Sequence, residues 1–270
     1  MDPIREKQLE LLQYFISVCE QLKLKWFCVC GTALGAAKYG GFIPWDDDID
    51  VALPRDDYDK FIEKASALLP EHIFLQNYQT DPAFPHEFCK LRNSNTTQIE
   101  VGVQNIRMNH GIYIDVFPLD GHPRSKVGHM IFELQNKVLT WKQFCFLKDS
   151  PHRRIRIRNF LLRILGYHNK MVQTMMKKEK LYKKYPIHQS EYWCNYGNWQ
   201  KQLEYAHHTQ YGNGISATFE GIEVVIPEKY DEYLTQKYGD WRSDPPVEKR
   251  KSHHRIAVFD AERSYVEYMK

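Results

Sequence analysis

The sequence predicts an α+β protein, in which a small mixed sheet with flanking helices is followed by a mostly helical C-terminal part. Strand-like runs alternate with helical patterns as far as residue 123. From residue 124 to about 210, long apolar and basic side chains follow one another without strand alternation, which favours helices. Because 43% of the 270 residues are apolar, the chain can bury a sizeable core, as one large domain or two smaller ones.

The elements of the first part follow from the spacing of apolar residues. Between residues 5 and 23, apolar side chains recur at steps of three and four, as in an amphipathic helix. Residues 48–53 alternate acidic and aliphatic side chains, which predicts a strand with Asp48 and Asp50 on one face. The same patterns predict a strand over 26–30, helical turns over 33–38, a helix over 55–69, and strands over 73–77, 88–92 and 111–117.

The second part is predicted to begin with helices and to return to a strand near its end. We therefore divide the chain into a catalytic core, residues 1–123, and a mostly helical subdomain, residues 124–270. In the subdomain we expect helices over 127–147, 155–165 and 172–185, a strand over 218–226, a helix over 228–238 and a polar tail.

Charge, cysteine content and hydropathy argue against a nucleic-acid-binding, disulfide-bonded or membrane-spanning protein. The 37 Lys and Arg against 34 Asp and Glu give a net charge of +3, too small an excess to predict nucleic-acid binding. The six cysteines show no CxxC spacing and are expected to be reduced and mostly buried. No apolar run approaches the roughly 20 residues that span a bilayer, and the N-terminal segment is charged, unlike a signal peptide. We therefore expect a cytoplasmic protein.

An acidic segment is the clearest candidate for chemistry. Residues 45–50 read WDDDID, and like charges this close repel one another unless a cation or solvent offsets them. Mg²⁺ prefers carboxylate and phosphate oxygens, so we expect Asp48 and Asp50 to bind a divalent metal. Asp115, within an apolar stretch, would be costly without a partner and completes the site as a ligand or general base. A solvated turn around Asp48 and a strand-edge role for Asp115 are the alternatives.

Two further features predict phosphate binding. Gly31 and Thr32, where the strand over 26–30 ends, would let backbone amides approach a phosphate. Lys90 and Arg92 alternate with apolar residues, so they would share one face of a strand and hold donor phosphates from it. Solvated strand-edge charges are the alternative for this pair.

Motifs are spread over most of the chain. The stretch GTALG at 31–35 is followed by GFIPWDDDIDV at 41–51. Further motifs are PRDDY at 54–58, KLR at 90–92 with Thr96 and Thr97, IDVFPLDG at 114–121, FEG at 219–221, Pro227, Tyr230, YL at 233–234, YGDW at 238–241, and His253 or His254. Together they resemble the LicD family, which belongs to the nucleotidyltransferase-fold superfamily. That family includes bacterial phosphocholine transferases and is related to the fukutin-type ribitol-phosphate transferases.

The resemblance implies a nucleotidyltransferase-like core and a set of site residues. Asp48, Asp50 and Asp115 match the superfamily's three strand carboxylates, which implies that they act in catalysis and bind Mg²⁺ or Mn²⁺. Thr32 stands where Gly or Ser is more usual, but it keeps a hydroxyl. The late motifs imply that residues about 215–255 return to the active-site region. Substrate-binding residues expected from the matched motifs are Gly31, Thr32, Trp45, Lys90, Arg92, Glu220 and His253.

The activity implied by the resemblance is transfer of a phospho-alcohol, foremost phosphocholine, from a CDP-activated donor. The acceptor would be a hydroxyl of a cell-surface glycan or glycolipid precursor, such as lipopolysaccharide or teichoic acid, and no nucleic acid is expected as partner. A nucleotidyltransferase acting on a nucleoside triphosphate stays open on the same carboxylates. A glycosyltransferase with an Asp-x-Asp metal site would need a nucleotide-binding α/β domain ahead of the acids, whereas only one strand is predicted before Asp48.

A choline head group would add a requirement for aromatic side chains. Its quaternary ammonium binds against aromatic faces, although any one aromatic residue is more often part of the core. Candidates in or beside the matched motifs are Trp45, Tyr113, Phe117 and Trp241.

Basic residues are concentrated in the second part of the chain. Between residues 142 and 163 there are seven Lys or Arg and one acid, and lysines recur between 177 and 184. We favour a solvated helix face as the interpretation. Peripheral contact with an anionic membrane, or with an anionic lipid-linked glycan, is the alternative. A module that only binds nucleic acid or membrane through these residues would leave the three carboxylates unexplained.

Overall fold

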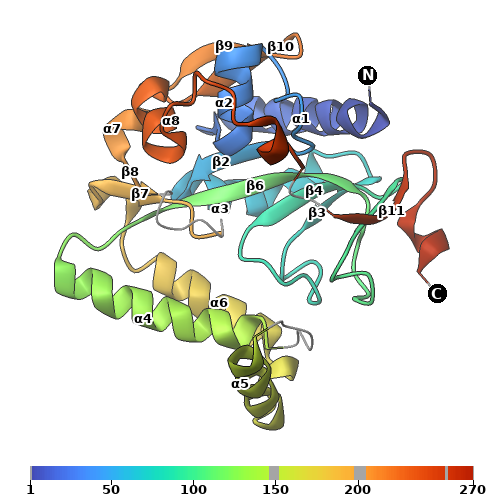
Figure 1. Ribbon diagram of the computed structural model, residues 1–270, viewed down its shortest axis with the longest axis vertical. Helices are drawn as coiled ribbons and strands as arrows, with labels where there is room; N and C mark the ends of the chain where they lie inside the picture. The colour runs from blue at the N-terminus through green and yellow to red at the C-terminus, as the bar shows by residue number, and fades with distance from the viewer. Residues whose placement is uncertain (1, 146–151, 198–204, 253–254, 270) are drawn as a thin grey trace.

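The computed structural model describes residues 2–145, 152–197, 205–252 and 255–269. Its centre is a seven-stranded mixed sheet (Figure 1), in which five strands follow the order β1-β2-β6-β4-β3. β2 and β6 are parallel, and the other neighbours in this order are antiparallel. The bounds are Phe27–Cys28 for β1, Asp50–Pro54 for β2, Ile73–Gln76 for β3, Cys89–Asn93 for β4 and Ile112–Gly121 for β6.

The remaining strands join segments that are far apart in the sequence. β7 (Tyr192–Cys194) pairs with the end of β6, and β8 (Tyr205–His207) pairs with β7. Two antiparallel pairs lie outside the main sheet: β5 (Thr97–Glu100) with β11 (Ile256–Asp260), and β9 (Ile215–Phe219) with β10 (Ile222–Ile226).

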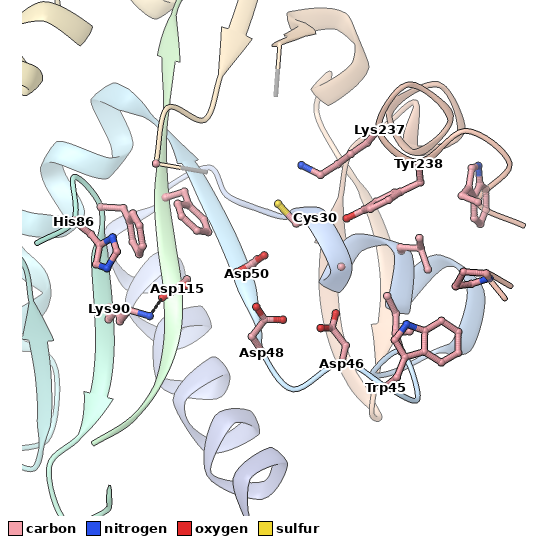
Figure 2. A pocket seen from close by; sticks show the side chains of 18 of the residues that line it. Cys30, Trp45, Asp46, Asp48, Asp50, His86, Lys90, Asp115, Lys237 and Tyr238 are labelled. Carbon is pink, nitrogen blue, oxygen red and sulfur yellow. Dashed lines mark ion pairs between the residues drawn. The ribbon is translucent and has the colours of Figure 1, made fainter. Parts of the chain in front are cut away.

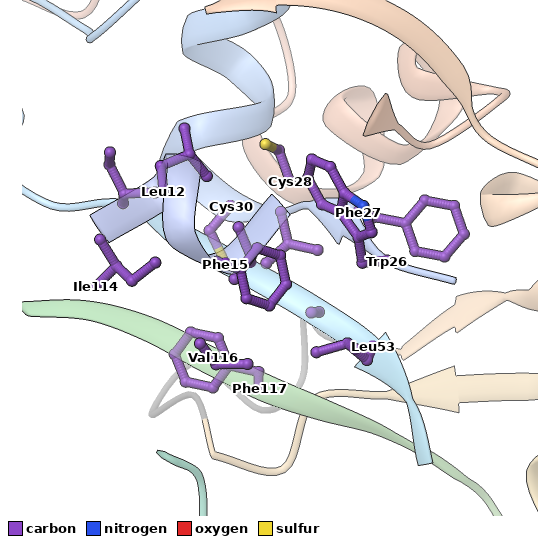
Figure 3. Packing of buried hydrophobic residues seen from close by; sticks show 14 of the residues in the cluster. Leu12, Phe15, Trp26, Phe27, Cys28, Cys30, Leu53, Ile114, Val116 and Phe117 are labelled. Carbon is purple, nitrogen blue, oxygen red and sulfur yellow. The ribbon is translucent and has the colours of Figure 1, made fainter. Parts of the chain in front are cut away.

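The main core lies between the sheet and its covering helices. All ten residues of β6 are buried, as expected for a central strand covered on both faces. Helix α1 (Pro3–Leu22) packs against β6 and β4, and α3 (Arg55–Lys64) packs against β2 and β6. In Figure 3, Leu12 and Phe15 of α1 lie in one buried cluster with β6 side chains such as Val116. This cluster fixes the two strands that carry Asp50 and Asp115.

Helix α2 (Cys30–Tyr39) begins two residues after β1 and is enclosed by late parts of the chain. It packs against the β9–β10 hairpin and against α8 (Tyr230–Tyr238), as seen at the top of Figure 1. The short helix α7 (His208–Tyr211) lies against α8.

Three longer helices form the lower part of Figure 1. α4 (Lys126–Gln143) packs against α6 (Met171–Tyr182), and α5 (Arg153–Ile164) contacts α4. A second, smaller core lies here, and its buried members are Phe132, Leu181, Tyr182, Cys194 and Tyr196. Within the residues that the structure describes, none of the helices is both long and apolar enough to cross a bilayer.

The α+β prediction is confirmed, and so is the expectation of buried thiols, because all six cysteines are buried and form no disulfide. Four strands were not predicted, namely β5, β7, β8 and β11. The strand expected over 218–226 is a hairpin, and residues 256–260, expected in a polar tail, form β11. Because β7 adds to β6, the second part of the chain completes the main sheet, and the boundary at 123/124 stays a prediction.

Candidate active site

A cavity of about 1070 Å³ is lined by the sheet, by α2 and by segments from the second part of the chain. Among the described residues eight carboxylates line it, and four of them interact electrostatically as one cluster: Asp46, Asp48, Asp50 and Asp115 (Figure 2). Residues between 237 and 245 line the cavity as well, and so do Tyr196 and the C-terminal end of α4. The three predicted carboxylates therefore meet in one cavity, and a fourth joins them.

The register of two parallel strands brings Asp50 and Asp115 together. Asp50 is the first residue of β2 and pairs with Asp115 of β6, so both side chains leave the sheet on the same face. The amide of Asp115 donates to the carbonyl of Ile49 at 2.9 Å, and the amide of Asp50 donates to Thr32 Oγ1 at 2.8 Å. Asp48, expected in the strand itself, lies in the loop that leads into β2. Thr32 thus helps to position Asp50 through a hydrogen bond to its backbone amide.

Helix α1 holds the backbone of the acidic loop. Arg5 donates from Nη2 to the carbonyl of Asp46 at 2.7 Å and, at longer distances, to two earlier carbonyls of the same loop. Gln8 is fully buried and donates from Nε2 to the carbonyl of Asp47 at 2.8 Å. The sequence predicted α1 as an amphipathic helix without a role at the site, because Arg5 and Gln8 belong to no motif.

The four carboxylates create an unfavourable concentration of negative charge. The pKa of Asp48 is raised well above its usual range, first by burial and then by the charges of Asp50, Asp46 and Asp115. A bound cation would remove this repulsion. Carboxylate oxygens are the ligands that Mg²⁺ and Mn²⁺ prefer, so the residues present fit a divalent metal of this kind.

Two sets of carboxylates are candidates for holding such a metal. Among the described residues, ligand atoms of Asp46, Asp47 and Asp48 lie within 4.8 Å of one another. The set expected from the sequence, Asp48, Asp50 and Asp115, shares only Asp48 with it. Asp47 does not line the cavity, and its carboxylate accepts a hydrogen bond from a serine hydroxyl at 2.7 Å. We favour the carboxylates that line the cavity, because a metal that contacts substrate has to lie there.

The two basic residues of β4 have different surroundings. Lys90 lines the cavity, where its Nζ lies 2.8 Å from Asp115 Oδ1 and 3.2 Å from the ring centroid of Tyr113. Asp115 Oδ1 accepts no hydrogen bond of good geometry from the described residues, so its contact with Lys90 is an ion pair. Arg92 is 1% exposed, does not line the cavity, and donates to a glutamine side chain and to the carbonyl of Gly111. The structure therefore brings Lys90 to the site and leaves Arg92 in the core.

Helix α2 begins at the cavity with a strained residue. Cys30 has a φ of 52°, in the left-handed region that non-glycine residues rarely adopt, and its amide donates to Tyr233 Oη at 3.1 Å. The next residue, Gly31, lines the cavity. A Cβ at Gly31 would lie 2.3 Å from Asp46 Oδ2, so only glycine leaves room for that carboxylate. Gly31 and Thr32 thus belong to the first turn of a helix, whereas the sequence placed them at a strand end.

Of the other residues expected to bind substrate, one lines the cavity and one supports a neighbouring loop. Trp45 lines the cavity. Glu220 is exposed in the turn between β9 and β10, and its Oε1 accepts from the amide of Phe42 at 3.1 Å, so it supports the glycine-rich loop before the acids. His253 lies outside the described residues.

Aromatic side chains line both sides of the cavity. Of the four predicted for a choline head group, Trp45, Phe117 and Trp241 line it, whereas Tyr113 is fully buried beneath Lys90. Phe88 was not predicted, although its ring centroid lies 4.4 Å from that of Phe117.

His86 is a second residue that the sequence reasoning missed. Its ring lies 5.1 Å from that of Phe88, centroid to centroid, and it also lines the cavity (Figure 2). Burial and then the charge of Lys90 lower the pKa of His86 to about 4, so the imidazole is neutral at physiological pH. His86 and Phe88 lie four and two residues before the KLR motif, and this proximity was the available signal.

Comparisons with known proteins identify the family to which the chain belongs. The family described as LicD/FKTN/FKRP, nucleotidyltransferase domain, matches residues 23–149, which include Asp46, Asp48, Asp50 and Asp115. The chain is also 30% identical over 264 residues to a protein of Haemophilus influenzae named lipopolysaccharide cholinephosphotransferase LicD, an alignment that covers 93% of this chain and 96% of the relative. The resemblance predicted from the motifs is confirmed, and the chain is an enzyme that belongs to the LicD family of transferases.

Proposed function

We propose that this enzyme transfers phosphocholine from CDP-choline to a hydroxyl group of lipopolysaccharide or a related glycan, with Mg²⁺ as cofactor. The observation that carries the proposal is one cavity that contains the cluster of Asp46, Asp48, Asp50 and Asp115 together with Lys90 and several aromatic rings. The similarity of this chain to a lipopolysaccharide cholinephosphotransferase, which extends over nearly its whole length, supports the same reaction.

The carboxylates would serve the phosphate part of the donor. Asp48, Asp50 and Asp115 would hold the metal, with Asp46 beside them. When bound, Mg²⁺ or Mn²⁺ would offset the charge that develops on the transferred phosphoryl group. Lys90, which is 4% exposed, would add a fixed positive charge next to Asp115.

The reaction itself requires a proton to leave the acceptor hydroxyl. Asp50 or Asp115 would accept that proton while the acceptor oxygen bonds to the phosphorus atom and the bond from phosphorus to CMP breaks. Both carboxylates are held by hydrogen bonds of their own backbone amides, so little reorganisation is needed.

The aromatic residues would serve the head group. A quaternary ammonium is attracted to ring faces and cannot donate a hydrogen bond. Phe88 and Phe117, with His86 neutral beside them, present an apolar aromatic surface next to Lys90 and Asp115. On this arrangement the choline group lies on the β4–β6 side of the cavity and is selected over polar alcohols such as ribitol.

A donor screen tests the proposal. Purified protein with Mg²⁺ is mixed with CDP-choline, CDP-ribitol, CDP-glycerol, CTP or a UDP-sugar, and thermal stability and CMP release are measured. Asp48→Asn should lose CMP release by about a hundredfold or more, which is typical for losing a group that stabilises transferred charge. Asp47→Asn is the matched control, because Asp47 is the adjacent carboxylate outside the cavity. It should keep activity within a few-fold.

Each competing activity has its own signature in the same screen. Pyrophosphate release from CTP alone would identify a nucleotidyltransferase, and turnover of a UDP-sugar would identify a glycosyltransferase. CMP release from CDP-ribitol or CDP-glycerol in preference to CDP-choline would keep the reaction class and reject the choline assignment. Equal losses in Asp47→Asn and Asp48→Asn would favour the alternative carboxylate set for the metal.

A further inference from the structure

Helix α5 has its apolar side turned toward solvent. Ile157, Phe160, Leu161 and Ile164 follow the spacing i, i+3, i+4, i+7 and so form one stripe along the helix. Each is between 50% and 66% exposed. A surface helix of a globular protein normally turns such a stripe to the core, so this orientation is reversed.

The polar side of α5 is the one attached to the protein. Asn159, on the opposite side of the helix, is 2% exposed, and its Nδ2 donates to the carbonyl of Phe144. The guanidinium of Arg158 donates to Asn159 Oδ1 at 2.8 Å and lies over the ring of Trp141 in α4. These contacts fix the orientation in which the apolar stripe faces outward.

Helix α4 carries a second stripe with the same spacing. Val127, Met130, Ile131 and Leu134 are 47% to 64% exposed, although α4 buries Phe132 on its other side. Exposed apolar patches of this size usually mark a surface that meets another molecule or a membrane.

The charges around the apolar stripe of α5 indicate what kind of surface it binds. α5 contains five arginines and no acidic residue, and Arg153, Arg154 and Arg156 are exposed beside the stripe. A second copy of this chain docking through the same face would bring these arginines opposite their equivalents, which is repulsive. An anionic bilayer offers both hydrocarbon for the stripe and phosphate groups for the arginines.

We propose that helices α4 and α5 dock on the surface of an anionic lipid bilayer, with α5 lying in the interface. In Figure 1, α5 lies at the extreme of the molecule farthest from α2 and the β9–β10 hairpin. α4 links this surface to the reaction cavity, because Thr140 and Phe144 at its C-terminal end line the cavity wall. Docking does not depend on the proposed reaction and holds for any substrate.

Vesicle co-sedimentation tests the proposal on the full chain. Vesicles of phosphatidylcholine alone are compared with vesicles rich in phosphatidylglycerol, at low and high salt. We expect binding to the anionic vesicles, weakened by salt because surface charges are screened. Phe160→Gln with Ile164→Gln should weaken binding about tenfold or more by removing apolar contact. Arg153→Gln with Arg154→Gln should weaken it roughly fivefold per arginine.

A matched control separates docking from a general surface effect. Val266→Gln with Arg263→Gln removes an exposed apolar residue and an exposed arginine from the C-terminal region, and it should bind vesicles like the unchanged protein. Thermal denaturation of each variant checks that it is folded. Equal binding by all three variants would overturn the proposal, as would failure of the unchanged protein to bind anionic vesicles. The unchanged protein could instead form a dimer and fail to bind vesicles. If that dimer dissociated in the variant Phe160→Gln with Ile164→Gln, the apolar stripe of α5 would be a self-association surface.

Discussion

At the scale of single residues, the site depends on close approach between α2 and the acidic loop. Gly31 lies where any Cβ would contact the carboxylate of Asp46, which also lines the cavity. The helix therefore sets how far this carboxylate can reach into the cavity, although Asp46 was not among the residues expected to bind metal.

Gly31→Ala should lower the rate of CMP release by at least tenfold, because the added methyl group displaces Asp46 from the cluster. The test is a double-mutant cycle for activity with Asp46→Ala. In the Asp46→Ala background the clash is gone, so Gly31→Ala should add little further loss. If the two losses simply add, the effect of Gly31→Ala does not act through Asp46.

The sequence identified the carboxylates but not what surrounds them. Asp48, Asp50 and Asp115 could be found because charged residues in an apolar pattern need a physical reason. The prediction that Arg92 reaches the cavity beside Lys90 was wrong, because alternation along a strand indicates which face a side chain is on and not how deeply it is buried. Both Lys90 and Arg92 are buried, but only Lys90 lines the cavity. Arg5 and Gln8 could not be found, because their roles depend on backbone carbonyls that no side-chain pattern records.

At the scale of elements, the long and strongly periodic ones were predictable and the short ones were not. α1 and α3 follow from apolar spacing over ten residues or more, and β6 was predicted over 111–117, although it runs on to Gly121. β7 and β8 are three residues long and exist because they pair with β6 and with each other, a contact between distant segments. The β9–β10 turn had a weak signal in Gly221, which lies between two apolar runs: Glu220 and Gly221 both have positive φ, and glycine adopts this conformation without strain.

One ion pair ties the start of α3 to the end of β6. Arg55 donates from Nε and Nη2 to the two oxygens of Asp120, each at 2.6 Å, and both residues are buried. Asp120→Asn should lower the free energy of unfolding by about 3–5 kcal/mol, because it removes the buried counter-charge of a buried guanidinium and leaves Arg55 only the exposed Asp59 carboxylate at 3.4 Å. Urea denaturation measures this. Arg55→Met with Asp120→Leu should cost less than the single change, and a larger cost for the double variant would contradict the argument.

At the scale of the whole molecule, the free energy of unfolding should depend on pH through a half-buried histidine, His122. His122 bonds Tyr196 and His129 near the start of α4, and burial followed by the charge of His129 lowers the pKa of His122 to about 4. The folded protein therefore keeps this ring neutral between about pH 6.5 and 4, whereas the unfolded chain protonates it. The free energy of unfolding should fall as pH falls through that window.

His122→Gln should flatten this dependence. The measurement is the free energy of unfolding by urea for both proteins at a series of pH values between about 7.5 and 4. The difference between the two proteins should shrink, or change sign, toward the acidic end. Parallel curves over the whole range would show that His122 does not carry the effect.

The cavity is lined by segments that are synthesised at widely separated times. The acidic loop, β2 and β6 emerge before residues 237–245 and before β11, which pairs with β5. Contacts between such distant segments form slowly, because long stretches of chain have to be brought together before the contacts stabilise them. We therefore expect a nascent chain on the ribosome to carry its carboxylates in an open, unfinished site. On the proposed function, the ability to bind the donor would appear only after residues 237–245 and β11 have been made and have folded back.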